Sequence, residues 1–312
     1  MNDVKALLLC NNPIALPGIR EFLFFGKVAV IGVPKRNKEM QQILEQMTKE
    51  TGTPVLLLEK KTYKTQLKQA LEQYEVNVGL MMTFPFIIPQ EILQMPAKGF
   101  INFHYGLLPK CRGPHPILWH LLNNDPECGV TVHKVDEGID TGPIIMQERI
   151  PIDETDTYGT LQGKLAYLAG RQAANLLKIL SYGSMVPATA QNEADAAYYE
   201  MPTAGDMTIK WAEMDTARII RIINACNPWN KGAGAMINNW FLGITEAEPA
   251  GDDHSDASVA PGTILACDKA QGLVVKTSDG KKLRINIIYT QEGFFSGYRL
   301  LNFGIKPGDV FT

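Results

Sequence analysis

The sequence is poor in cysteine, and its cysteines form no paired motif. The five are spread over the chain as Cys10, Cys111, Cys128, Cys226 and Cys267. Their odd number and wide spacing exclude the framework of a small disulfide-stapled domain, and the lack of a C-x-x-C pair argues against a zinc ribbon. We therefore expect reduced thiols, as in a cytosolic protein, and no metal site.

The sequence also lacks a long hydrophobic run. Its longest apolar stretch, residues 79–89, is interrupted by Thr83 and Pro85 and falls well short of the roughly 20 residues that a membrane helix needs. The apolar run at residues 6–10 is followed at once by two asparagines and a proline, which leaves it too short for the core of a secretory signal. We expect a cytoplasmic protein that does not enter a membrane.

Neither sign of charge dominates the composition. Lys and Arg number 30 and Asp and Glu number 33, for a net charge of −3. This balance disfavours a polybasic nucleic-acid binder, although an enzyme that holds RNA through one local patch is compatible with it. The 312 residues, 45 % of them hydrophobic and 20 % charged, are typical of a globular chain of about two domains.

The first half of the chain alternates short β-rich runs with helical stretches, which predicts a parallel sheet flanked by helices. Strands are expected at residues 4–9, 28–33, 54–58, 76–82, 99–104, 128–135 and 144–150, and helices at 39–50, 64–74 and 157–182. The predicted fold class is α/β, a doubly wound, mostly parallel sheet of Rossmann-like type. Nucleotide motifs are missing, because the nearest approach to G-x-G-x-x-G, at Gly232 and Gly234, has no third glycine. Another kind of ligand is expected beyond the carboxyl ends of the strands.

The pattern changes after residue 183. Residues 184–205 contain two prolines and several Ala, Asn and Thr residues, which predicts a linker between two domains. Beyond a helix expected at 215–226, strands are predicted at residues 235–245, 262–267, 273–277 and 283–289. Short strands at this spacing predict a small β-rich, OB-like module. The domains are thus expected at residues 1–183 and 206–312.

The predicted strand at residues 99–104 presents two polar side chains on one face. Successive residues of a strand alternate faces, so Asn102 and His104 point the same way at its carboxyl end. A Gly-flanked acidic loop at residues 136–142 can bring the carboxylate of Asp140 to the same cleft. These side chains suit acyl transfer to an amine. The imidazole can take the proton of the attacking amine, the carboxylate can raise the pKa of the imidazole, and the amide can donate to the oxygen of a tetrahedral intermediate.

Spacing alone leaves plainer interpretations open. His104 can be a structural histidine at a strand end, and Asp140 can cap a turn. His133, on the predicted strand at residues 128–135, is interpreted as a supporting or structural histidine. Four basic residues at the ends of elements are interpreted as solvated charges: Lys35, Arg36, Lys60 and Lys61.

A set of motifs resembles the folate-dependent formyltransferases, which include methionyl-tRNA formyltransferase, the sugar-nucleotide N-formyltransferases and glycinamide ribonucleotide transformylase. The matching runs are Asn102-Phe-His104-Tyr-Gly-Leu-Leu-Pro109, Arg112-Gly113, Gly129-Val-Thr-Val-His133 and Asp140-Thr-Gly142. Residues 227–229, 261–265, 272–275 and 306–309 are similar to the C-terminal module of methionyl-tRNA formyltransferase. The resemblance therefore covers nearly the whole chain. It implies transfer of the formyl group of 10-formyltetrahydrofolate, a cosubstrate, to a primary amine.

The resemblance also implies roles for individual residues. Asn102, His104 and Asp140 match the catalytic triad of the family. A folate pocket is implied at Met82, Thr83, Phe84, Phe86, Ile88, Gly106, Leu107, Leu108, Pro109, Asp136, Glu137, Gly138 and Ile139. Apolar and aromatic walls suit a flat heterocycle such as the pterin of the donor. No metal is implied.

The chain departs from the family pattern in two places. Relatives read His-Gly-Ser-Leu-Leu-Pro where this chain has Tyr105 and Gly106 after His104, which predicts a reshaped acceptor pocket. Methionyl-tRNA formyltransferases carry a long basic loop after the second strand, whereas only residues 34–38 stand there in this chain. The domain plan favours methionyl-tRNA as the acceptor. The two departures favour a smaller amine, such as a nucleotide-linked amino sugar or a carrier-bound aminoacyl group.

Two other classes of function stay open. One is a 10-formyltetrahydrofolate hydrolase, in which water replaces the amine, and the other is a non-catalytic folate- or RNA-binding module, which the complete triad disfavours. If a tRNA is bound, local charge predicts where. Residues 246–256 contain five acidic residues and no Lys or Arg, whereas residues 268–284 contain five basic and two acidic residues. This polarity points to Lys281, Lys282 and Arg284.

Overall fold

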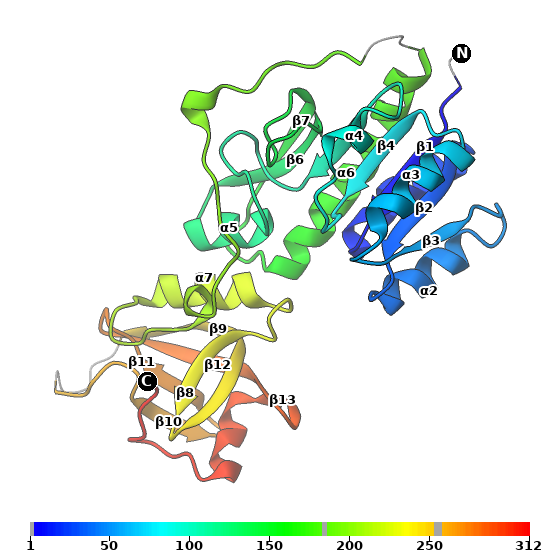
Figure 1. Cartoon of the computed structure of the whole chain (residues 1–312). Coiled ribbons are helices and arrows are strands. Elements are labelled where there is room, and N and C mark those ends of the chain that lie inside the picture. Colours follow the sequence, from blue (N-terminus) through cyan, green and yellow to red (C-terminus); the bar gives the residue numbers. More distant parts are fainter. Residues whose placement is uncertain (1–2, 183–185, 253–257) are drawn as a thin grey trace. The chain divides into compact units, whose positions relative to one another are not determined.

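The computed structural model describes residues 3–182, 186–252 and 258–312 and divides into two compact units (Figure 1). Unit 1 contains Met1–Pro116, Glu127–Pro151 and Gln162–Glu200, and unit 2 contains Ile117–Pro126, Ile152–Leu161 and Met201–Thr312. Each unit has its own sheet. Residues 184 and 185 of the expected linker lie outside the described residues, and the domain limits at 183 and 206 stay predictions.

In the described part of unit 1 a seven-stranded sheet has the order β3-β2-β1-β4-β5-β6-β7. Its strands are β1 (Ala6–Cys10), β2 (Val28–Pro34), β3 (Val55–Leu58), β4 (Val78–Met82), β5 (Phe100–His104), β6 (Glu127–Lys134) and β7 (Ile144–Pro151). The first five strands pair in parallel, and β6 and β7 are antiparallel. The predicted α/β class, with its mostly parallel sheet, is confirmed.

Helices cover both faces of this sheet, with α3 on one face and α6 on the other (Figure 1). The helices are α1 (Leu16–Phe24), α2 (Lys38–Met47), α3 (Tyr63–Gln73), α4 (Gln90–Leu93) and α6 (Tyr158–Tyr182). Every residue of the central strand β1 is buried, as expected for a strand covered on both sides. The sequence patterns did not indicate α1 and α4. In α1, Pro17 lies in the first turn, where proline removes only an N–H that has no partner within the helix.

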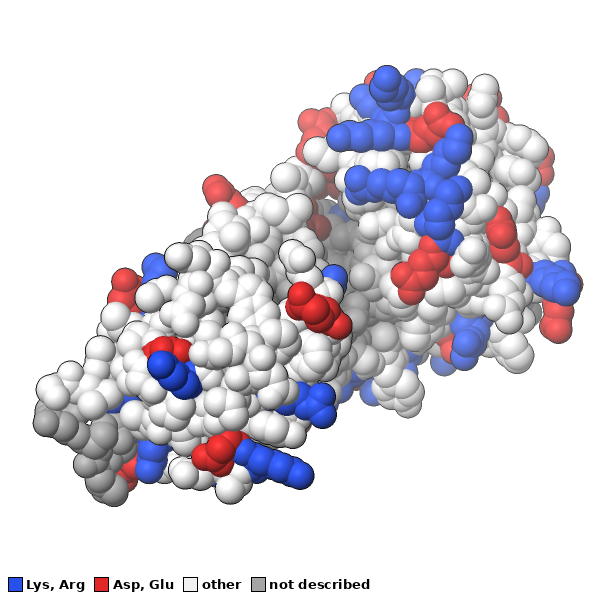
Figure 2. Space-filling view, turned by 90° about the horizontal axis from the view of Figure 1, so that it is seen from below, with Lys and Arg blue, Asp and Glu red and all other residues white. Residues whose placement is uncertain are grey.

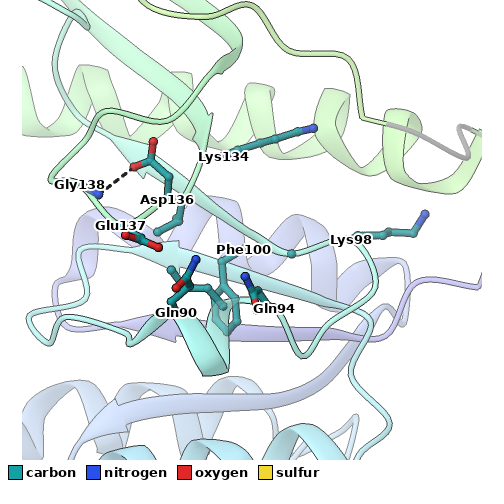
Figure 3. Close-up of a pocket in the computed structure, with 11 residues that line it drawn as sticks. Gln90, Gln94, Lys98, Phe100, Lys134, Asp136, Glu137 and Gly138 are labelled. Carbon is teal, nitrogen blue, oxygen red and sulfur yellow. Dashed lines mark hydrogen bonds between the residues drawn. The ribbon is translucent and has the colours of Figure 1, made fainter.

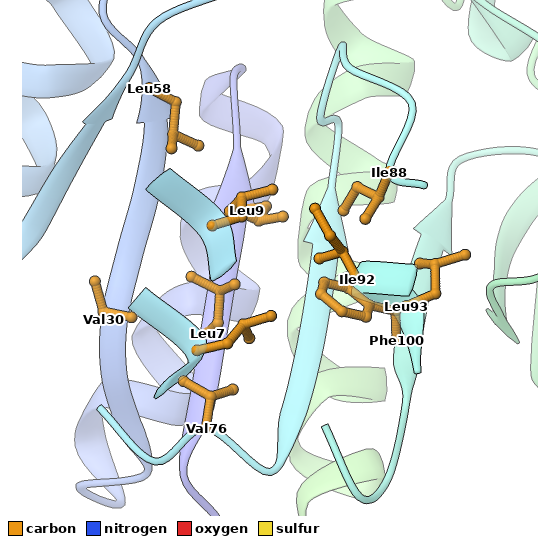
Figure 4. Packing of buried hydrophobic residues seen from close by; sticks show 11 residues of the cluster. Leu7, Leu9, Val30, Leu58, Val76, Ile88, Ile92, Leu93 and Phe100 are labelled. Carbon is orange, nitrogen blue, oxygen red and sulfur yellow. The ribbon is translucent and has the colours of Figure 1, made fainter. Parts of the chain in front are cut away.

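A cluster of buried side chains joins the sheet to α3 and α4 (Figure 4). It includes Leu7 and Leu9 of β1 and Phe100 of β5, all at most 2 % exposed. Gly79 of β4 admits the ring of Phe100, because a Cβ atom at this glycine would lie 2.2 Å from the ring. This packing fixes the start of β5, the strand whose carboxyl end carries His104.

Unit 2, as far as it is described, contains an antiparallel sheet of order β10-β11-β12-β9-β8, with β13 paired to β12. Its strands are β8 (Ala233–Ile237), β9 (Trp240–Asp252), β10 (Ile264–Asp268), β11 (Gly272–Lys276), β12 (Lys281–Thr290) and β13 (Gly293–Ser296). The helix α7 (Thr216–Cys226) packs against β8, β9 and β12. The predicted β-rich C-terminal module is confirmed. The helix α5 covers Pro116–Asn123.

One predicted strand of unit 2 is in fact a hairpin. The expected strand at residues 235–245 is interrupted at Asn238 and Asn239, whose φ angles are 47° and 63°. Asparagine tolerates this left-handed conformation, and a turn with two such residues matches the twist of antiparallel strands. β8 and β9 therefore pair with each other, with Ile237 opposite Trp240.

Short 3-10 helices complete the described elements. They are η1 (Pro13–Ala15), η2 (Glu193–Asp195), η3 (Gly205–Met207) and η4 (Gly297–Phe303). No helix among the described residues is long and apolar enough to cross a membrane. All five cysteines are buried.

Candidate active site

The carboxyl ends of β1, β4 and β5 are neighbours at one edge of the sheet in unit 1. After β1, the chain adds β2 and β3 on one side of that strand. It then returns to add β4 and β5 on the other side, so the topological switch point lies between β1 and β4. Beyond these strands the N–H of Asn11 donates to Oγ1 of Thr83 across 3.3 Å, and the side chain of Asn37 donates to the carbonyl of Asn11 across 2.7 Å. Ligand sites of open α/β sheets form at such a point, and β5 ends beside it in His104.

The structure brings the three predicted catalytic side chains together. Asn102 and His104 lie on β5, and Asp140 lies in the loop between β6 and β7. Nδ2 of Asn102 donates to Oδ1 of Asp140 across 3.3 Å, and Nδ1 of His104 lies 3.5 Å from Oδ2 of the same carboxylate. The N–H of Gly113 also donates to Oδ2, across 3.0 Å. One carboxylate is thus the common partner of an amide, an imidazole and a backbone N–H.

The surroundings of Asp140 keep its carboxyl group ionised. Burial by itself raises the pKa of this group, but the imidazole of His104 and the N–H of Gly113 act against burial, and the pKa lies well below its usual range. A charged carboxylate beside His104 favours the protonated form of the imidazole.

Both ring nitrogens of His104 face acceptors. Nε2 lies 2.5 Å from the carbonyl oxygen of Cys111, while Nδ1 faces Asp140. The side chain of His104 is only 6 % exposed. The imidazolium form donates from both nitrogens, whereas the neutral ring, which can accept a proton, carries only one hydrogen. Nε2 can therefore take a proton from an amine only when it lacks its own hydrogen and the carbonyl of Cys111 is displaced.

Asn102 is oriented by the buried His133. Nδ1 of His133 lies 2.8 Å from the carbonyl oxygen of Lys134, which can only accept, so in the neutral ring this nitrogen carries the hydrogen. Nε2 then accepts from Nδ2 of Asn102 at 3.1 Å. The supporting role that the sequence suggests for His133 agrees with this contact.

Two contacts of Asp140 had no counterpart in the sequence analysis. One is the N–H of Gly113, which belongs to a family motif without an assigned role. The other is Gln191, whose Nε2 donates to the carbonyl oxygens of Asp140 and Gly142, each at 2.8 Å. No sequence signal marks Gln191, because it lies in the stretch that reads as a linker and only the fold brings it to the site. Within the described ranges no cluster of His, Cys, Asp and Glu suits a metal ion.

A pocket of about 530 Å³ opens beside the loop that follows β6 (Figure 3). It is lined by Gln90, Leu93, Gln94, Lys98, Gly99, Phe100, Lys134, Val135, Asp136, Glu137 and Gly138. Figure 3 shows the side chains of Gln90, Gln94 and Glu137 around the same opening. Three residues implied for folate, Asp136, Glu137 and Gly138, therefore line a pocket whose size suits a small ligand.

The other residues implied for folate take no part in the lining of this pocket. Five of them are buried: Met82, Ile88, Gly106, Leu107 and Leu108. Phe84 and Phe86 pack edge to face at 5.2 Å and against the core cluster, whereas Ile139 is exposed. The implied folate set is thus divided between an apolar wall and an open pocket.

Tyr105 lies inside unit 1, which differs from its expected place at an acceptor pocket. It is 5 % exposed, and its hydroxyl donates to the carbonyl of Ile14 across 3.4 Å. The neighbouring Gly106 leaves room for the ring of His104, because a Cβ atom at this position would lie 2.8 Å from Nε2 of that ring. The departure from the family pattern therefore acts on the packing around His104.

Exposed basic side chains gather on two neighbouring loops of unit 1 and on the first residues of the helices α2 and α3 that follow them. The loops follow β2 and β3, whose ends are adjacent because Pro34 pairs with Leu58. The exposed basic residues are Lys35, Arg36, Lys38, Lys60, Lys61 and Lys64, beside the exposed acids Glu39 and Glu59. Figure 2 shows Lys and Arg side chains gathered on the unit at the right of the view. We call these six residues the basic loop surface. The exposure of Lys35, Arg36, Lys60 and Lys61 agrees with their interpretation as solvated charges at the ends of elements.

The expected charge polarity of unit 2 is wrong in the described part of that unit. Arg284 lies opposite Glu248 in the ladder of β12 and β9, and the two form an ion pair at 3.2 Å. Lys281 pairs with Asp279 at 3.4 Å. The acidic and basic stretches are neighbouring strands, so their charges compensate each other. Asp253 and Asp256 of the acidic stretch lie outside the described residues.

Comparison with known proteins adds an independent finding. Residues 26–175 match the family described as "Formyl transferase", and residues 203–296 match "Formyl transferase, C-terminal domain". A methionyl-tRNA formyltransferase from Ralstonia nicotianae is 34 % identical over 245 residues, which cover 78 % of this chain and 73 % of that protein.

Two solved structures share the fold at low identity. HypX from Aquifex aeolicus, in complex with tetrahydrofolic acid, has a TM-score of 0.68 and 17 % identity; the match covers 96 % of this chain and 47 % of HypX, so this chain spans about half the length of HypX. An N-formyltransferase from Helicobacter canadensis, in complex with folinic acid and dTDP-3-aminofucose, has a TM-score of 0.67 and 19 % identity, with 90 % and 98 % coverage. At these identities the likeness concerns the fold alone.

Proposed function

The chain belongs to the formyl transferase family, and on this premise we propose that it transfers the formyl group of 10-formyltetrahydrofolate to the amino group of an aminoacyl-tRNA. The observation that carries the chemistry is the arrangement of Asn102 and His104 around the carboxylate of Asp140. Each of these three groups has a separate task in moving an acyl group to an amine.

The donor supplies the formyl carbon, to which the amine nitrogen binds as the bond to the folate nitrogen breaks. His104 accepts the proton that the amine loses and returns a proton to the departing nitrogen, a contribution of about 10²- to 10⁴-fold for a positioned general base. Asp140 stabilises the protonated ring. As the formyl oxygen gains negative charge, Asn102 donates an amide hydrogen to it in place of one of its present partners. The loss of such a donor typically reduces the stabilisation of the transition state by roughly 2.7 to 4 kcal/mol.

The loop that carries Asp140 also borders the pocket at the start of β5, and its residues fit a folate donor. Glu137 offers a carboxylate there, whereas Asp136 already accepts from the N–H of Gly138 and the hydroxyl of Thr141. A flat heterocycle with several N–H donors suits acceptors of this kind next to apolar walls. In the proposal Phe84 and Phe86 supply the aromatic part of the wall.

Two observations support a tRNA acceptor. The relative from Ralstonia nicotianae, similar over most of both chains, is named for methionyl-tRNA. The basic loop surface lies at the carboxyl edge of the sheet, the same edge at which β5 presents His104. Phosphate groups of an acceptor arm bind to such a surface because each contact releases counterions.

A smaller amine is the second candidate acceptor. Only Lys35, Arg36 and Asn37 separate β2 from α2, so the long basic loop typical of methionyl-tRNA formyltransferases is missing. Relatives of the same fold include an enzyme solved with dTDP-3-aminofucose. A nucleotide-linked amino sugar therefore belongs in any test of the acceptor.

The test follows the release of tetrahydrofolate with charged methionyl-tRNA, with a dTDP-amino sugar and with no acceptor. We expect release with the charged tRNA, and its loss in His104→Ala and Asp140→Asn, while both variants stay folded and still bind the donor. The exposed Asp3→Asn is the control for the same chemical change.

Each arm of this test can contradict the proposal in a distinct way. If tetrahydrofolate is released only with the amino sugar, the proposed acceptor is wrong but the proposed formyl transfer stands. If formate is released without any acceptor, the protein is a hydrolase and not a transferase. Near-wild-type transfer by His104→Ala overturns the assigned catalytic residues.

A further inference from the structure

We propose that Gln191 is a positioning residue of the active site, which holds the catalytic loop by the backbone of Asp140 and is itself held by the buried Arg112. This inference rests on the proposed function, since it assumes that Asp140 takes part in formyl transfer. It also gives a role to residues 186–200, the described stretch that the sequence analysis treats as part of a linker. We call this stretch the 186–200 segment.

The loop that carries Asp140 needs outside support. Asp140 has a φ of 56°, in the left-handed region that residues with a side chain seldom adopt. Two residues on, Gly142 approaches β6 so closely that a Cβ atom there would lie 1.8 Å from the carbonyl oxygen of Lys134. A backbone in this conformation persists only where its surroundings fix it.

Gln191 supplies this support from outside the loop. Its amide nitrogen donates one hydrogen to the carbonyl oxygen of Asp140 and the other to that of Gly142, both across 2.8 Å. The two carbonyl groups stand before and after Thr141 in the chain. Their hydrogen bonds to Gln191 therefore fix the backbone of Asp140, the residue whose side chain is the carboxylate of the site. The side-chain oxygen of Gln191 faces the opposite way, toward Arg112.

Arg112 fixes the orientation of Gln191. Its Nε and one terminal nitrogen donate to Oε1 of Gln191 across 3.1 and 2.8 Å, so this oxygen cannot exchange places with the amide nitrogen. The same guanidinium pairs with both carboxylate oxygens of Glu193 at 2.7 and 2.9 Å and donates to the hydroxyl of Tyr198 across 2.6 Å. Arg112 is 0 % exposed, and a buried charge with this many partners is held in one geometry.

The 186–200 segment is itself fixed at both ends. Thr189 exchanges two backbone hydrogen bonds with Ile144 at the start of β7, each of 2.8 Å. At the other end the N–H of Ala197 donates to the carbonyl of Pro109, and the backbone of Arg112 bonds to Ala197 and Tyr199. The segment therefore joins the start of β7 to the loop that follows β5.

The segment also reaches the carboxylate side of Asp140. Gly113, whose N–H donates to Oδ2 of Asp140, has a φ of 103° and lies so close to Tyr199 that a Cβ atom would be 2.2 Å from its carbonyl oxygen. The backbone of Asp140 is held through Gln191, and its carboxylate through Gly113. Loss of the first contact lets the carboxylate move relative to His104, and a misplacement of about 1 Å in an active site can cost on the order of 100-fold in rate.

The test compares Gln191→Leu, Gln191→Glu and Asn192→Ala in the full chain. Leu removes both ends of the side chain, whereas Glu keeps an oxygen for Arg112 and loses the two hydrogens that reach Asp140 and Gly142. Asn192→Ala is the matched control, because the side chain of Asn192 is exposed and bonds only locally, to Ala194 and Asp195. The readouts are kcat, the KM for the formyl donor and the midpoint of thermal unfolding.

We expect both Gln191 variants to lower kcat by about 10- to 100-fold, with a KM for the donor within about twofold of the wild type, because the donor pocket is untouched. Asn192→Ala keeps wild-type values. If Gln191→Leu fails to fold, Gln191→Glu decides, since it keeps the partner of Arg112. Unchanged kcat in a folded Gln191→Glu overturns the inference.

A second measurement separates positioning from a general loss of structure. In the Asp140→Asn background Gln191→Leu should lower kcat by less than about twofold, because Gln191 acts through Asp140 and the two losses are not additive. If the fold-decrease in kcat of the double variant equals the product of the decreases in the two single variants, the inference is overturned. If the wild type itself transfers no formyl group, the proposed function fails instead, so the two failures are distinguishable.

Discussion

At the scale of single residues, the proposed chemistry depends on how the carboxylate of Asp140 is shared. Asp140 accepts from Asn102 and Gly113 and faces the imidazoles of His104 and His133. A group with this many partners keeps its charge although it is buried. In the proposed mechanism, the same contacts that prepare His104 for proton transfer therefore also stabilise the folded state.

The low pKa of Asp140 makes part of this stability dependent on pH. In the unfolded chain an Asp takes up its proton near pH 4, whereas in the folded protein Asp140 keeps its charge to a lower pH. The unfolded state then binds more protons, so the contribution of Asp140 is fully present above about pH 5 and is lost as the pH falls toward the folded pKa. We expect the difference in the free energy of unfolding between the wild type and Asp140→Asn to shrink from pH 7 to pH 3 in urea titrations. A difference that stays constant over this range contradicts the prediction.

A second residue-scale prediction concerns the space beside the catalytic ring. In Gly106→Ala the new methyl group would lie 2.8 Å from Nε2 of His104 and 2.8 Å from Cβ of Pro116, so the ring or the helix start must shift. We expect kcat to fall about 10-fold while the chain stays folded, because small displacements of reacting groups are costly. Steady-state kinetics with the donor and charged tRNA measure it. Gly163→Ala, which meets no atom within 4 Å, is the control and should leave kcat unchanged.

At the scale of elements, the long helix α6 contains glycines in two different settings. Gly163 is exposed with open space around it, whereas a Cβ atom at Gly170 would lie 3.1 Å from Cβ of Pro17. Alanine loses less backbone entropy than glycine in a helix. We expect Gly163→Ala to raise the free energy of unfolding by roughly 0.5 to 1 kcal/mol, as measured by denaturant unfolding. Gly170→Ala should gain less or destabilise the protein, and an equal gain in both variants would show that the contact with Pro17 does not matter.

The elements also show how far the sequence predicts this fold. Apolar runs such as β1 and β2 identify central strands because both of their faces are buried, and that property is local to the sequence. α1 escapes prediction since Pro17 resembles a turn signal until its place in a first helical turn is known. The turn at Asn238 and Asn239 is missed because asparagine is accepted in both strands and turns, and only its left-handed backbone decides.

For the site, the limit of sequence reasoning has a physical cause. Asn102 and His104 are two residues apart on a strand, so periodicity alone places them on one face. Family motifs then bring in Asp140. Gln191 is 51 residues from Asp140, and its contact arises from the path of the 186–200 segment across unit 1, which no local pattern encodes.

At the scale of the whole molecule, a net charge of −3 conceals an uneven distribution. In unit 2 acidic and basic side chains meet across paired strands. In unit 1 the basic loop surface presents six basic residues beside two acidic ones, one of which, Glu59, pairs with Lys35 at 2.5 Å. Composition averages over both arrangements, so it underrates the capacity of unit 1 to hold a polyanion.

The charge distribution predicts which surface holds a tRNA. We expect the double variant Lys60→Glu, Lys61→Glu to raise the KM for charged tRNA several-fold and to lower the slope of log KM against log salt by about 1 to 2, because phosphate contacts release counterions. The matched control is Lys281→Glu, Lys282→Glu in unit 2, where Asp279 already pairs with Lys281, and it should change little. Titrations of activity between low and moderate salt measure both. If neither pair matters, the smaller amine becomes the favoured acceptor.

Because all five cysteines are buried, the rate at which their thiols react with an alkylating reagent reports local opening of the fold. Alkylation requires a thiolate that a reagent can reach, and burial raises the pKa of Cys10 to about 12, so this thiol is inert while its surroundings are closed. Cys10, Cys111 and Cys128 sample unit 1, and Cys226 and Cys267 sample unit 2. The rate at which each thiol is modified thus measures how often its own neighbourhood opens, without any attached probe. Cys111 does so at the loop whose carbonyl meets His104, the contact that an incoming amine must displace.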